Sequence, residues 1–413
     1  MADPRHRKRS KGSTDIRRRR VAIGERPTTA RDLNRTATQD AARRRSRRVV
    51  TASAAAVAMV AGAVALTYWL TREVTVPPPD AAVPSDAGAS SLVVVTGEGD
   101  LGASIALVVS HPAFPDRVAL FPPNLVAVLP GFGEQTIGEA PLIGGAELSE
   151  LTVTNLLGTR VDAVSVLTAE QLAALIPAGL EVDLPVPLVV SEGGGEVVDI
   201  PAGRTTLDGP TLARLLVTQG SGDQLSWLQR QEAVWKALLA SVAGGGALVD
   251  GLGTVDRGNP DLGRAALVGV AADPDFALTG LSVGRIGVAG PGSPELYELP
   301  AKAVADFLSD QVPFLALREG ERPRVEILNG NGDIGTTQPV AALLVRSGFR
   351  VVRTDNADSS DYAQSQVIAQ GGEHQQDALD IRALLATGEV LVDQRQPSTV
   401  VDVTIIVGKD LPG

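Results

Sequence analysis

The stretch "VEILNGNGDIG", from Val325 to Gly335, has glycines at positions 330, 332 and 335, which is the spacing G-x-G-x-x-G. It continues a β-branched apolar run and precedes "TTQPVAALLVRSG", where apolar residues recur with helical spacing. The next run, "FRVVRTD", ends at Asp355, 20 positions past the last glycine. A strand, a glycine turn and a helix in this order predict an α/β unit. They also match the fingerprint of a dinucleotide site.

The charge of the chain is divided unevenly along its 413 residues. Residues 1–48 contain 17 Lys and Arg against 5 Asp and Glu, which leaves 20 basic and 43 acidic residues elsewhere. Two segments of opposite charge are typical of a chain whose parts face different surroundings. The chain has no cysteine and three scattered histidines, so it has neither a disulfide framework nor a thiolate zinc site.

Residues 49–71, "VVTASAAAVAMVAGAVALTYWLT", contain no charged residue and lie between Arg48 and Arg72. As a helix they would span about 34 Å, which exceeds the roughly 30 Å of a hydrocarbon core. A buried core helix rarely has an arginine cluster against one end, and a signal peptide has a shorter apolar run followed by a cleavage site. We therefore expect a single transmembrane helix. The arginines before it predict a cytoplasmic N-terminus and an extracytoplasmic bulk at the plasma membrane.

The segments on either side of this helix have simple compositions. Residues 1–48 are predicted to be a disordered basic cytoplasmic tail that is attracted to anionic lipid; binding to nucleic acid or to a cytoplasmic partner is the alternative. The tail has no helix-turn-helix pattern, so we expect no nucleic-acid partner. Residues 72–91, which include "VPPPDAAVPSDAGASS", are predicted to be a semi-rigid Pro/Ala/Ser linker.

The middle of the chain alternates predicted strands and helices, which indicates an α/β fold. "SLVVVTGEGD", "SIALVVS", "RVALFPPNLVAVLP" and "GLEVDLPVPLVV" are typical of strands. "TAEQLAALI" begins with a threonine cap, and Asp208 and Asp223 precede two further helices. In the longer of these helices we expect one buried face, formed by Leu225, Leu228, Val234, Leu238 and Val242.

The order "TVTNLLGTRVDAVSVLTAEQLAALI", "GLEVDLP", "GRTTLDGPTLARLL", "LQRQEAVWKALLAS" resembles the LytR-CpsA-Psr family. The resemblance covers about residues 92–245, and a weaker part extends to 316. Members of that family are membrane-anchored, extracytoplasmic enzymes that transfer glycopolymers from a polyprenyl-pyrophosphate carrier to peptidoglycan. The resemblance therefore implies an LCP-like α/β domain over residues 92–316.

Most of the charged residues that the resemblance would require are absent. The family's strand aspartate falls on Ser104, its arginine–aspartate pair on Pro123 and Asn124, its two helix arginines on Val217 and Gln219, and the first arginine of R-x-x-R-Q on Trp227. Moving a pyrophosphate-linked group needs a carboxylate-bound divalent cation and several cationic side chains. We therefore predict a degenerate domain without confident catalytic residues or cofactor. Mg²⁺ would be needed only if the chain were an active phosphotransferase.

Four residues stand where the family pattern expects them: Asp208, Asp223, Arg230 and Gln231. Each has a structural alternative. The two aspartates could be helix caps rather than metal ligands, and Arg230 and Gln231 could orient a buried helix rather than bind a ligand. Trp227 and Trp235 could belong to the core or recognise a lipid. If the pocket persists without its charges, it could hold a polyprenyl tail.

Residues 324–413 predict a small domain of order β-α-β-(β)-α-β. "VEILNGNG", "GFRVV", "NADSSDY" and "VDVTIIVGKD" resemble the LytR C-terminal domain. A nucleotide site is not expected, because this loop is predicted to lie outside the cell and only 58 residues follow Asp355. Asn329, Gly330, Asn331 and Gly332 remain either a structural turn or an anion-binding loop.

These observations predict a non-catalytic cell-envelope protein. Its expected partners are the membrane and wall glycopolymer, peptidoglycan or polyprenyl phosphate, or an active paralogue that it scaffolds. The alternative is an active phosphotransferase that attaches glycopolymers to peptidoglycan.

Overall fold

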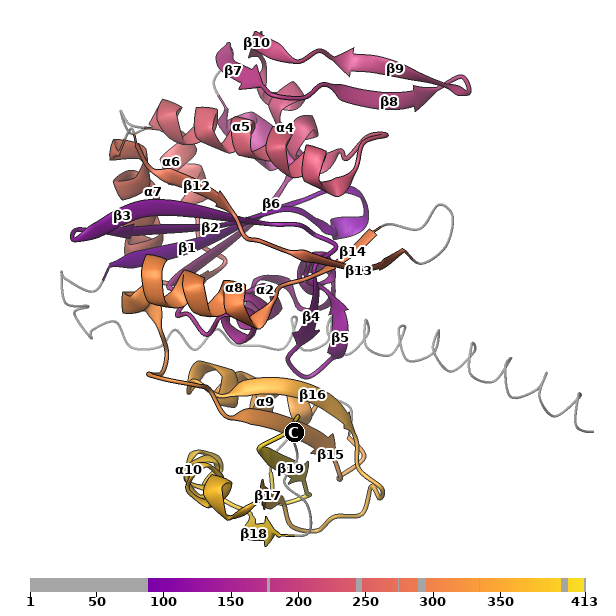
Figure 1. Ribbon diagram of the computed structural model, residues 1–413, viewed down its shortest axis with the longest axis vertical. Helices are drawn as coiled ribbons and strands as arrows, with labels where there is room; N and C mark the ends of the chain where they lie inside the picture. The colour runs from indigo at the N-terminus through magenta and orange to yellow at the C-terminus, as the bar shows by residue number, and fades with distance from the viewer. Residues whose placement is uncertain are drawn as a thin grey trace, which may run out of the picture. The chain divides into compact units, whose positions relative to one another are not determined.

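The computed structural model describes residues 88–411 except 177–178, 243–246, 274, 289–294, 334 and 395–399 (Figure 1). The basic tail, the transmembrane helix and most of the linker predicted above lie outside these residues. Among the described residues, no helix is both long enough and apolar enough to cross a bilayer. The last positions assigned to the linker, from Ala89, already belong to the first strand, β1.

The middle module is built on a six-stranded mixed sheet of order β11-β6-β1-β2-β3-β12. β1 pairs antiparallel with β2 and parallel with β6, and β3 pairs parallel with β12. Every residue of β1 is buried, which is expected of a central strand covered on both faces. The strands are β1 (Ala89–Thr96), β2 (Gly102–His111), β3 (Phe114–Phe121), β6 (Ala163–Thr168), β11 (Arg257–Gly258) and β12 (Ala277–Gly280).

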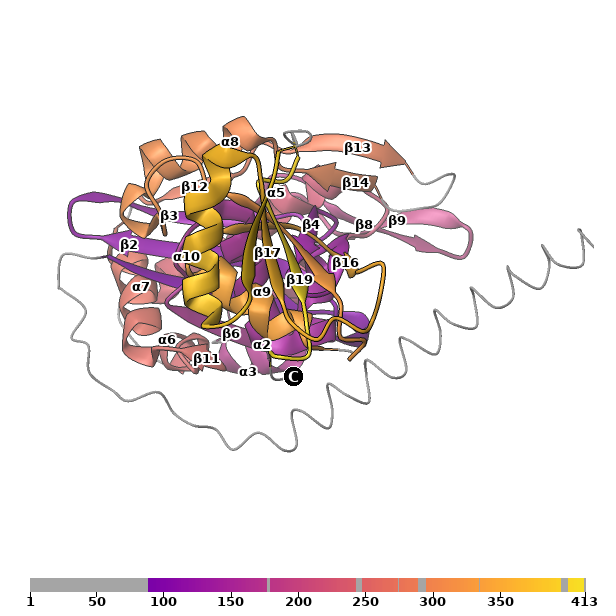
Figure 2. The same ribbon diagram turned by 90° about the horizontal axis from the view of Figure 1, so that it is seen from below.

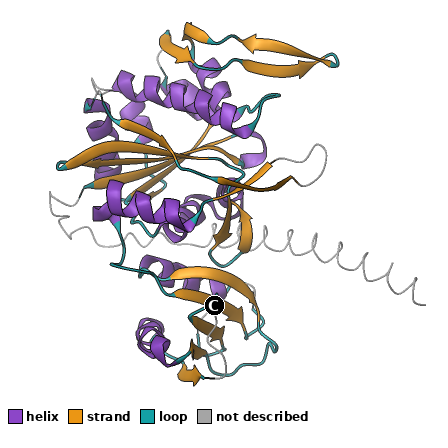
Figure 3. Cartoon of the chain, viewed as in Figure 1, coloured by secondary structure: helices purple, strands orange, loops and turns teal. Residues whose placement is uncertain are grey.

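Helices cover both faces of this sheet, which confirms the predicted α/β fold (Figure 3). Val93 and Val95 of β1 pack on one side, and Leu92 and Val94 pack on the other. The first side holds α3 (Ala169–Leu175), α4 (Gly209–Val217), α5 (Gln224–Val242), α6 (Ala247–Leu252) and α7 (Pro260–Ala272). The second side holds α2 (Ala140–Leu157) and the end of α8 (Ala301–Asp306), where Phe307 is buried.

Four small strand pairs lie outside the main sheet. The β8–β9 hairpin extends beyond α4 and α5 in both views (Figures 1 and 2). The sequence did not indicate its second strand, because glycines and acidic residues interrupt the apolar pattern there. The pairs are β4 (Val126–Leu129) with β5 (Gly133–Thr136), β7 (Leu180–Leu184) with β10 (Gly203–Leu207), β8 (Leu188–Glu192) with β9 (Gly195–Ile200), and β13 (Gly284–Val288) with β14 (Glu295–Glu298).

In the first turn of α5, the buried face of the helix differs from the predicted one. Leu225, expected to be buried, is 48% exposed, and Gln224 is buried instead. The buried positions Gln224, Trp227 and Gln231 follow a spacing of three and four residues, which places Leu225 to one side of that face. Val234, Leu238 and Val242 are buried as predicted.

The C-terminal module is a five-stranded sheet of order β16-β15-β19-β17-β18, with both of its helices in one shared core. β19 pairs parallel with β15 and antiparallel with β17. The predicted order missed β18, so the observed order is β-α-β-β-α-β-β. The elements are β15 (Arg324–Asn329), α9 (Thr337–Arg346), β16 (Arg350–Asn356), β17 (Gln366–Gln370), α10 (Gln375–Leu385), β18 (Glu389–Asp393) and β19 (Val403–Val407).

The C-terminal end of α2 joins the two modules, and all described residues belong to one compact unit. The Asn155 side chain pairs with the backbone of edge strand β16: its Nδ2 donates to the Val351 carbonyl at 2.8 Å, and the Val351 amide donates to its Oδ1 at 2.9 Å. Arg322 donates to the Asn155 carbonyl at 2.8 Å. Glu150 forms ion pairs with Arg257 and with Arg346 of α9. Carbonyls that have no partner within α2 thus receive donors from the adjoining module.

Replacing Asn155 with Ala would leave the buried N–H and C=O groups of Val351 without partners. Each such group costs about 1–3 kcal/mol, so we expect the urea midpoint of the full chain in detergent micelles, followed by circular dichroism, to fall clearly. Asn356→Ala is the control, because Asn356 is exposed at the end of the same strand. Equal midpoints for the two variants would contradict this role of Asn155.

Candidate functional site

Asp208 and Asp223 are both N-terminal caps of helices. The Thr211 amide donates to Asp208 Oδ1 at 3.0 Å, and the Ser226 amide donates to Asp223 Oδ1 at 2.7 Å. Hydrogen bonds from Thr211 and Ser226 lower the pKa of the respective carboxyl below its usual range. Each carboxylate already performs the role that the capping alternative assigned to it.

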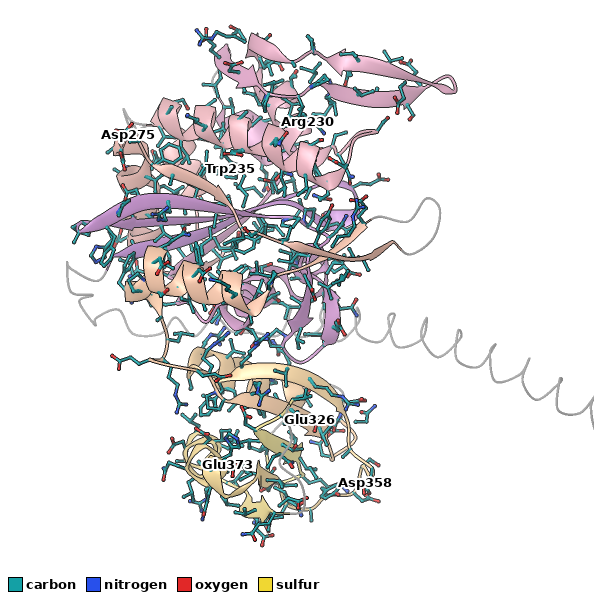
Figure 4. All side chains as sticks on the ribbon, viewed as in Figure 1. Arg230, Trp235, Asp275, Glu326, Asp358 and Glu373 are labelled. Carbon is teal, nitrogen blue, oxygen red and sulfur yellow. The ribbon has the colours of Figure 1, made fainter. Side chains whose placement is uncertain are left out.

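Arg230, which Figure 4 labels on α5, and Gln231 are both buried, and each donates to a backbone carbonyl at or just after the end of α4. Arg230 Nη2 donates to the Gln219 carbonyl at 2.5 Å, and Gln231 Nε2 donates to the Leu216 carbonyl at 2.9 Å. Trp227 Nε1, on the same face, donates to the Leu215 carbonyl at 3.2 Å. Trp227 and Gln231 therefore donate to the last carbonyls of α4, which have no partner within that helix, and Arg230 donates to the Gln219 carbonyl in the loop that follows α4.

Arg230 makes one further contact of the same kind. Its Nη1 donates to the Pro187 carbonyl at 3.1 Å, in the segment between β7 and β8. The residue is 2% exposed, and burial lowers the pKa of its guanidinium, although the Asp223 charge opposes this. The geometry thus supports the structural alternative, in which Arg230 positions a buried helix, over contact with a phosphate.

Two further polar side chains of this region, Ser104 and Asn124, are also hydrogen-bonded internally. Trp235 Nε1 donates to the buried Ser104 Oγ at 3.0 Å, which places Trp235 in the core rather than at a surface. Asn124 Nδ2 donates to Gln224 Oε1 at 3.0 Å. Gln231 Nε2 also donates to the Ala103 carbonyl at 2.9 Å. These side chains are thus hydrogen-bonded within the middle module.

The carboxylates of this region do not assemble a divalent-cation site. Mg²⁺ is held by several oxygen ligands in near-octahedral geometry. Within the described part of the chain, no cluster of three or more His, Asp or Glu residues has the arrangement of a metal site. Asp208 and Asp223 each bind a backbone amide instead. The donor set does not fit the cation that phosphotransfer would require.

The glycine loop after β15 is closed by its own side chains. Asn329 Oδ1 accepts from the amides of Asn331 and Gly332, and Asn331 Oδ1 accepts from the amide of Asp333. The Gly330 amide donates to the Val407 carbonyl. The amides that would bind an anion are therefore already hydrogen-bonded, and the geometry favours the structural alternative.

The glycines themselves are required by conformation and packing. Gly332 has φ +81°, and a Cβ on Gly330 would approach the side chain of Ile406 to 2.7 Å. Asp355 is paired with Arg353 on an exposed part of β16. The mixed five-stranded sheet also differs from the parallel sheet of a dinucleotide-binding fold.

Two of the hollows formed by the described residues lie elsewhere in the structure. An apolar pocket beneath β1 and β2, lined by Leu92, Ile105 and Val153 among others, has a volume of about 10 Å³. That is about the minimum for one water molecule. A second cleft, of about 240 Å³, lies where β4, β5, α2, β14 and β16 meet. No sequence signal indicated the second cleft, because its walls come from segments far apart in the chain.

The capping role of Asp223 can be separated from metal binding by two substitutions. Asn caps helices about as well as Asp, whereas Ala costs about 1 kcal/mol. We expect Asp223→Asn to keep the chemical-denaturation midpoint of the parent at pH 7, and Asp223→Ala to lower it. Because the folded pKa lies below the usual 3.8, the contribution of the charge is present above that pH and is lost as the pH falls through the folded pKa. Equal losses for both variants would contradict the capping role.

Comparisons with known proteins give one family match and several similar solved structures. The family described as "LytR cell envelope-related transcriptional attenuator" matches residues 322–411. A transcriptional regulator from Enterococcus faecalis is 19% identical over 57% of this chain and 91% of its own, with a TM-score of 0.46. Bacillus subtilis TagV is 17% identical over 56% of this chain and 98% of its own, with a TM-score of 0.43.

A LytR-CPS2A-psr family protein, YwtF (TagT), solved with bound octaprenyl pyrophosphate lipid, is 16% identical over 58% of this chain and 95% of its own, with a TM-score of 0.40. None of the curated proteins compared with the chain matches it. The family match covers nearly all of the segment in which a C-terminal domain was expected. Residues 322–411 are therefore a LytR C-terminal domain.

Proposed function

We propose that this protein is a membrane-anchored, non-catalytic component of the cell envelope that binds wall glycopolymer or scaffolds an active paralogue. The observation that carries the proposal is the LytR C-terminal domain at residues 322–411, a family described as cell envelope-related. The second support is the internal use of the polar groups of α5.

The location is proposed from the sequence. Residues 49–71 are free of charge and lie between arginines, and the cluster "RRRSRR" precedes them. By the positive-inside rule this places the N-terminus in the cytoplasm and the folded modules outside the plasma membrane. An extracytoplasmic position agrees with a chain that contains no cysteine and with a domain associated with the cell envelope.

The absence of catalysis is proposed from the geometry of α5 and of the two aspartates. Stabilising a pyrophosphate in the transition state requires donors aimed at the developing charge. The guanidinium of Arg230 instead faces backbone carbonyls of the protein, and Asp208 and Asp223 accept from helix amides. Freeing any of these groups for a substrate would leave buried carbonyls or helix amides without partners.

Among the proposed ligands, the glycopolymer is favoured over the polyprenyl carrier. A prenyl chain needs an apolar cavity many times larger than the 10 Å³ pocket beneath β1 and β2. A glycopolymer can bind along an exposed polar surface instead. Polyprenyl phosphate remains a partner only if the middle module opens.

The alternative function is that of an active phosphotransferase that uses Mg²⁺ and a rearranged site. A transfer assay distinguishes it from the proposed non-catalytic function. The full chain in nanodiscs is incubated with a polyprenyl-pyrophosphate-linked glycan, peptidoglycan and Mg²⁺. We expect no transfer above that of a heat-inactivated sample, and we expect the chain to co-sediment with glycopolymer-bearing wall. Metal-dependent transfer that disappears in Asp223→Asn would establish the enzyme instead.

The proposed topology can be tested by labelling, because the chain has no native cysteine. Ser359 is exposed in the C-terminal module, and Ser10 lies in the basic tail. We expect Ser359→Cys to react with a membrane-impermeant maleimide in intact cells and Ser10→Cys to react only after permeabilisation. The reverse pattern would place the modules in the cytoplasm.

A further inference from the structure

The 240 Å³ cleft between the modules, here called the junction cleft, collects charges of both signs. Arg350 of β16 lines it together with Glu134 of β5 and Glu298 of β14. None of these three side chains forms a hydrogen bond or an ion pair within 4.0 Å with any described residue. Oppositely charged side chains around one cleft would pair if they could reach one another. All three side chains are exposed, and they line the cleft without pairing with one another.

The neighbouring arginines, unlike Arg350, are hydrogen-bonded or ion-paired within the protein. Arg322 donates to carbonyls at the end of α2, and Arg324 pairs with Asp402 at 2.6 Å. Burial lowers the pKa of the Arg350 guanidinium, and the positive charge of Arg324 lowers it further, while Glu321 has the opposite effect. Arg350 is thus the cation of this group whose charge lacks a bound partner, so an anionic group placed beside it would relieve repulsion.

The remaining walls of the cleft are apolar or already hydrogen-bonded. Leu156, Ile286 and Leu299 present carbon surface, and Ile286 is 46% exposed. Asn155 faces the cleft, but its amide is used by Val351. Pockets for drug-sized ligands measure about 300–1,000 Å³, so this cleft suits a smaller molecule.

We propose that the junction cleft binds a short zwitterionic peptide, of about dipeptide size. Its carboxylate is held by Arg350, its ammonium group by Glu134 or Glu298, and its side chains contact Leu156 and Ile286. Arginine is suited to a carboxylate because its planar guanidinium forms paired hydrogen bonds. A ligand with one charge would satisfy only one side of the cleft. This site is separate from α5 and does not depend on the proposed absence of catalysis.

The test uses three matched probes with the full chain in detergent micelles, measured by isothermal titration calorimetry. They are unblocked alanyl-leucine, its N-acetyl form without the ammonium group, and its C-terminal amide without the carboxylate. We expect the unblocked peptide to bind and each blocked form to bind about tenfold more weakly or worse, since each loses a charge-assisted contact. Equal binding of all three, or no binding at millimolar concentration, would overturn the proposal.

Two glutamine substitutions provide the matched comparison. Arg350→Gln should abolish the preference for the free carboxylate, whereas Arg382→Gln, on the exposed side of α10, should leave binding unchanged. Because Arg350 has no internal partner, its substitution should not lower the melting temperature. If that variant nevertheless fails to fold, the double variant Glu134→Gln, Glu298→Gln decides: it should bind the unblocked and N-acetyl forms alike. Retained discrimination would exclude the site.

Discussion

Two helices of this protein end in the interior, where their last carbonyl groups need donors other than water. A helix leaves four carbonyls without partners at its C-terminal end, and each one buried without a donor costs about 1–3 kcal/mol. For α4 the donors are Trp227 and Gln231 of α5, and Arg230 donates to the Gln219 carbonyl just past that helix. For α2 the donor is Arg322, at the start of the C-terminal domain. The first set of donors holds α5 against α4 within the middle module. The second holds the start of the C-terminal domain against α2.

The need for donors at buried carbonyls determines how the Arg230 guanidinium is used. An arginine near a helix C-terminus is favourable both as a donor and as a charge against the helix dipole. The Arg230 guanidinium donates to the carbonyls of Gln219 and Pro187. If it turned toward a phosphate, those carbonyls would lose this donor. Nearby, Asn124 donates to Gln224, and the Asp223 carboxylate has a favourable charge interaction with Arg230. The result is a packed contact between α4 and α5.

At the junction between the modules, buried backbone groups also receive side-chain partners, and the junction cleft lies beside them. Asn155 supplies the edge of β16 with a donor and an acceptor, as a neighbouring strand would. Glu150 adds ion pairs to Arg257 and Arg346. These contacts hold β16 near β4 and β5 without pairing the strands, so the junction cleft remains between them.

The sequence alone determined the α/β class, and it offered helix caps at Asp208 and Asp223 and a structural turn after β15 as one of two alternatives at each place. These depend on neighbours a few residues apart, such as Thr211, which binds Asp208 three positions earlier. It also marked the C-terminal domain, because turn glycines and strand patterns are local signals. It missed β18 and misplaced Leu225, since the sheet partner of β18 and the buried face of α5 are set by tertiary packing.

Only the tertiary structure decided what Arg230 and Asn155 do and where the junction cleft lies. From the sequence, Arg230 could equally bind a phosphate or orient a buried helix. The structure shows that it donates to the Gln219 carbonyl, 11 positions away in the chain. Asn155 and Val351 are separated by 196 positions. Contacts at such distances leave no periodicity or motif in the sequence, because only the folded backbone brings them together.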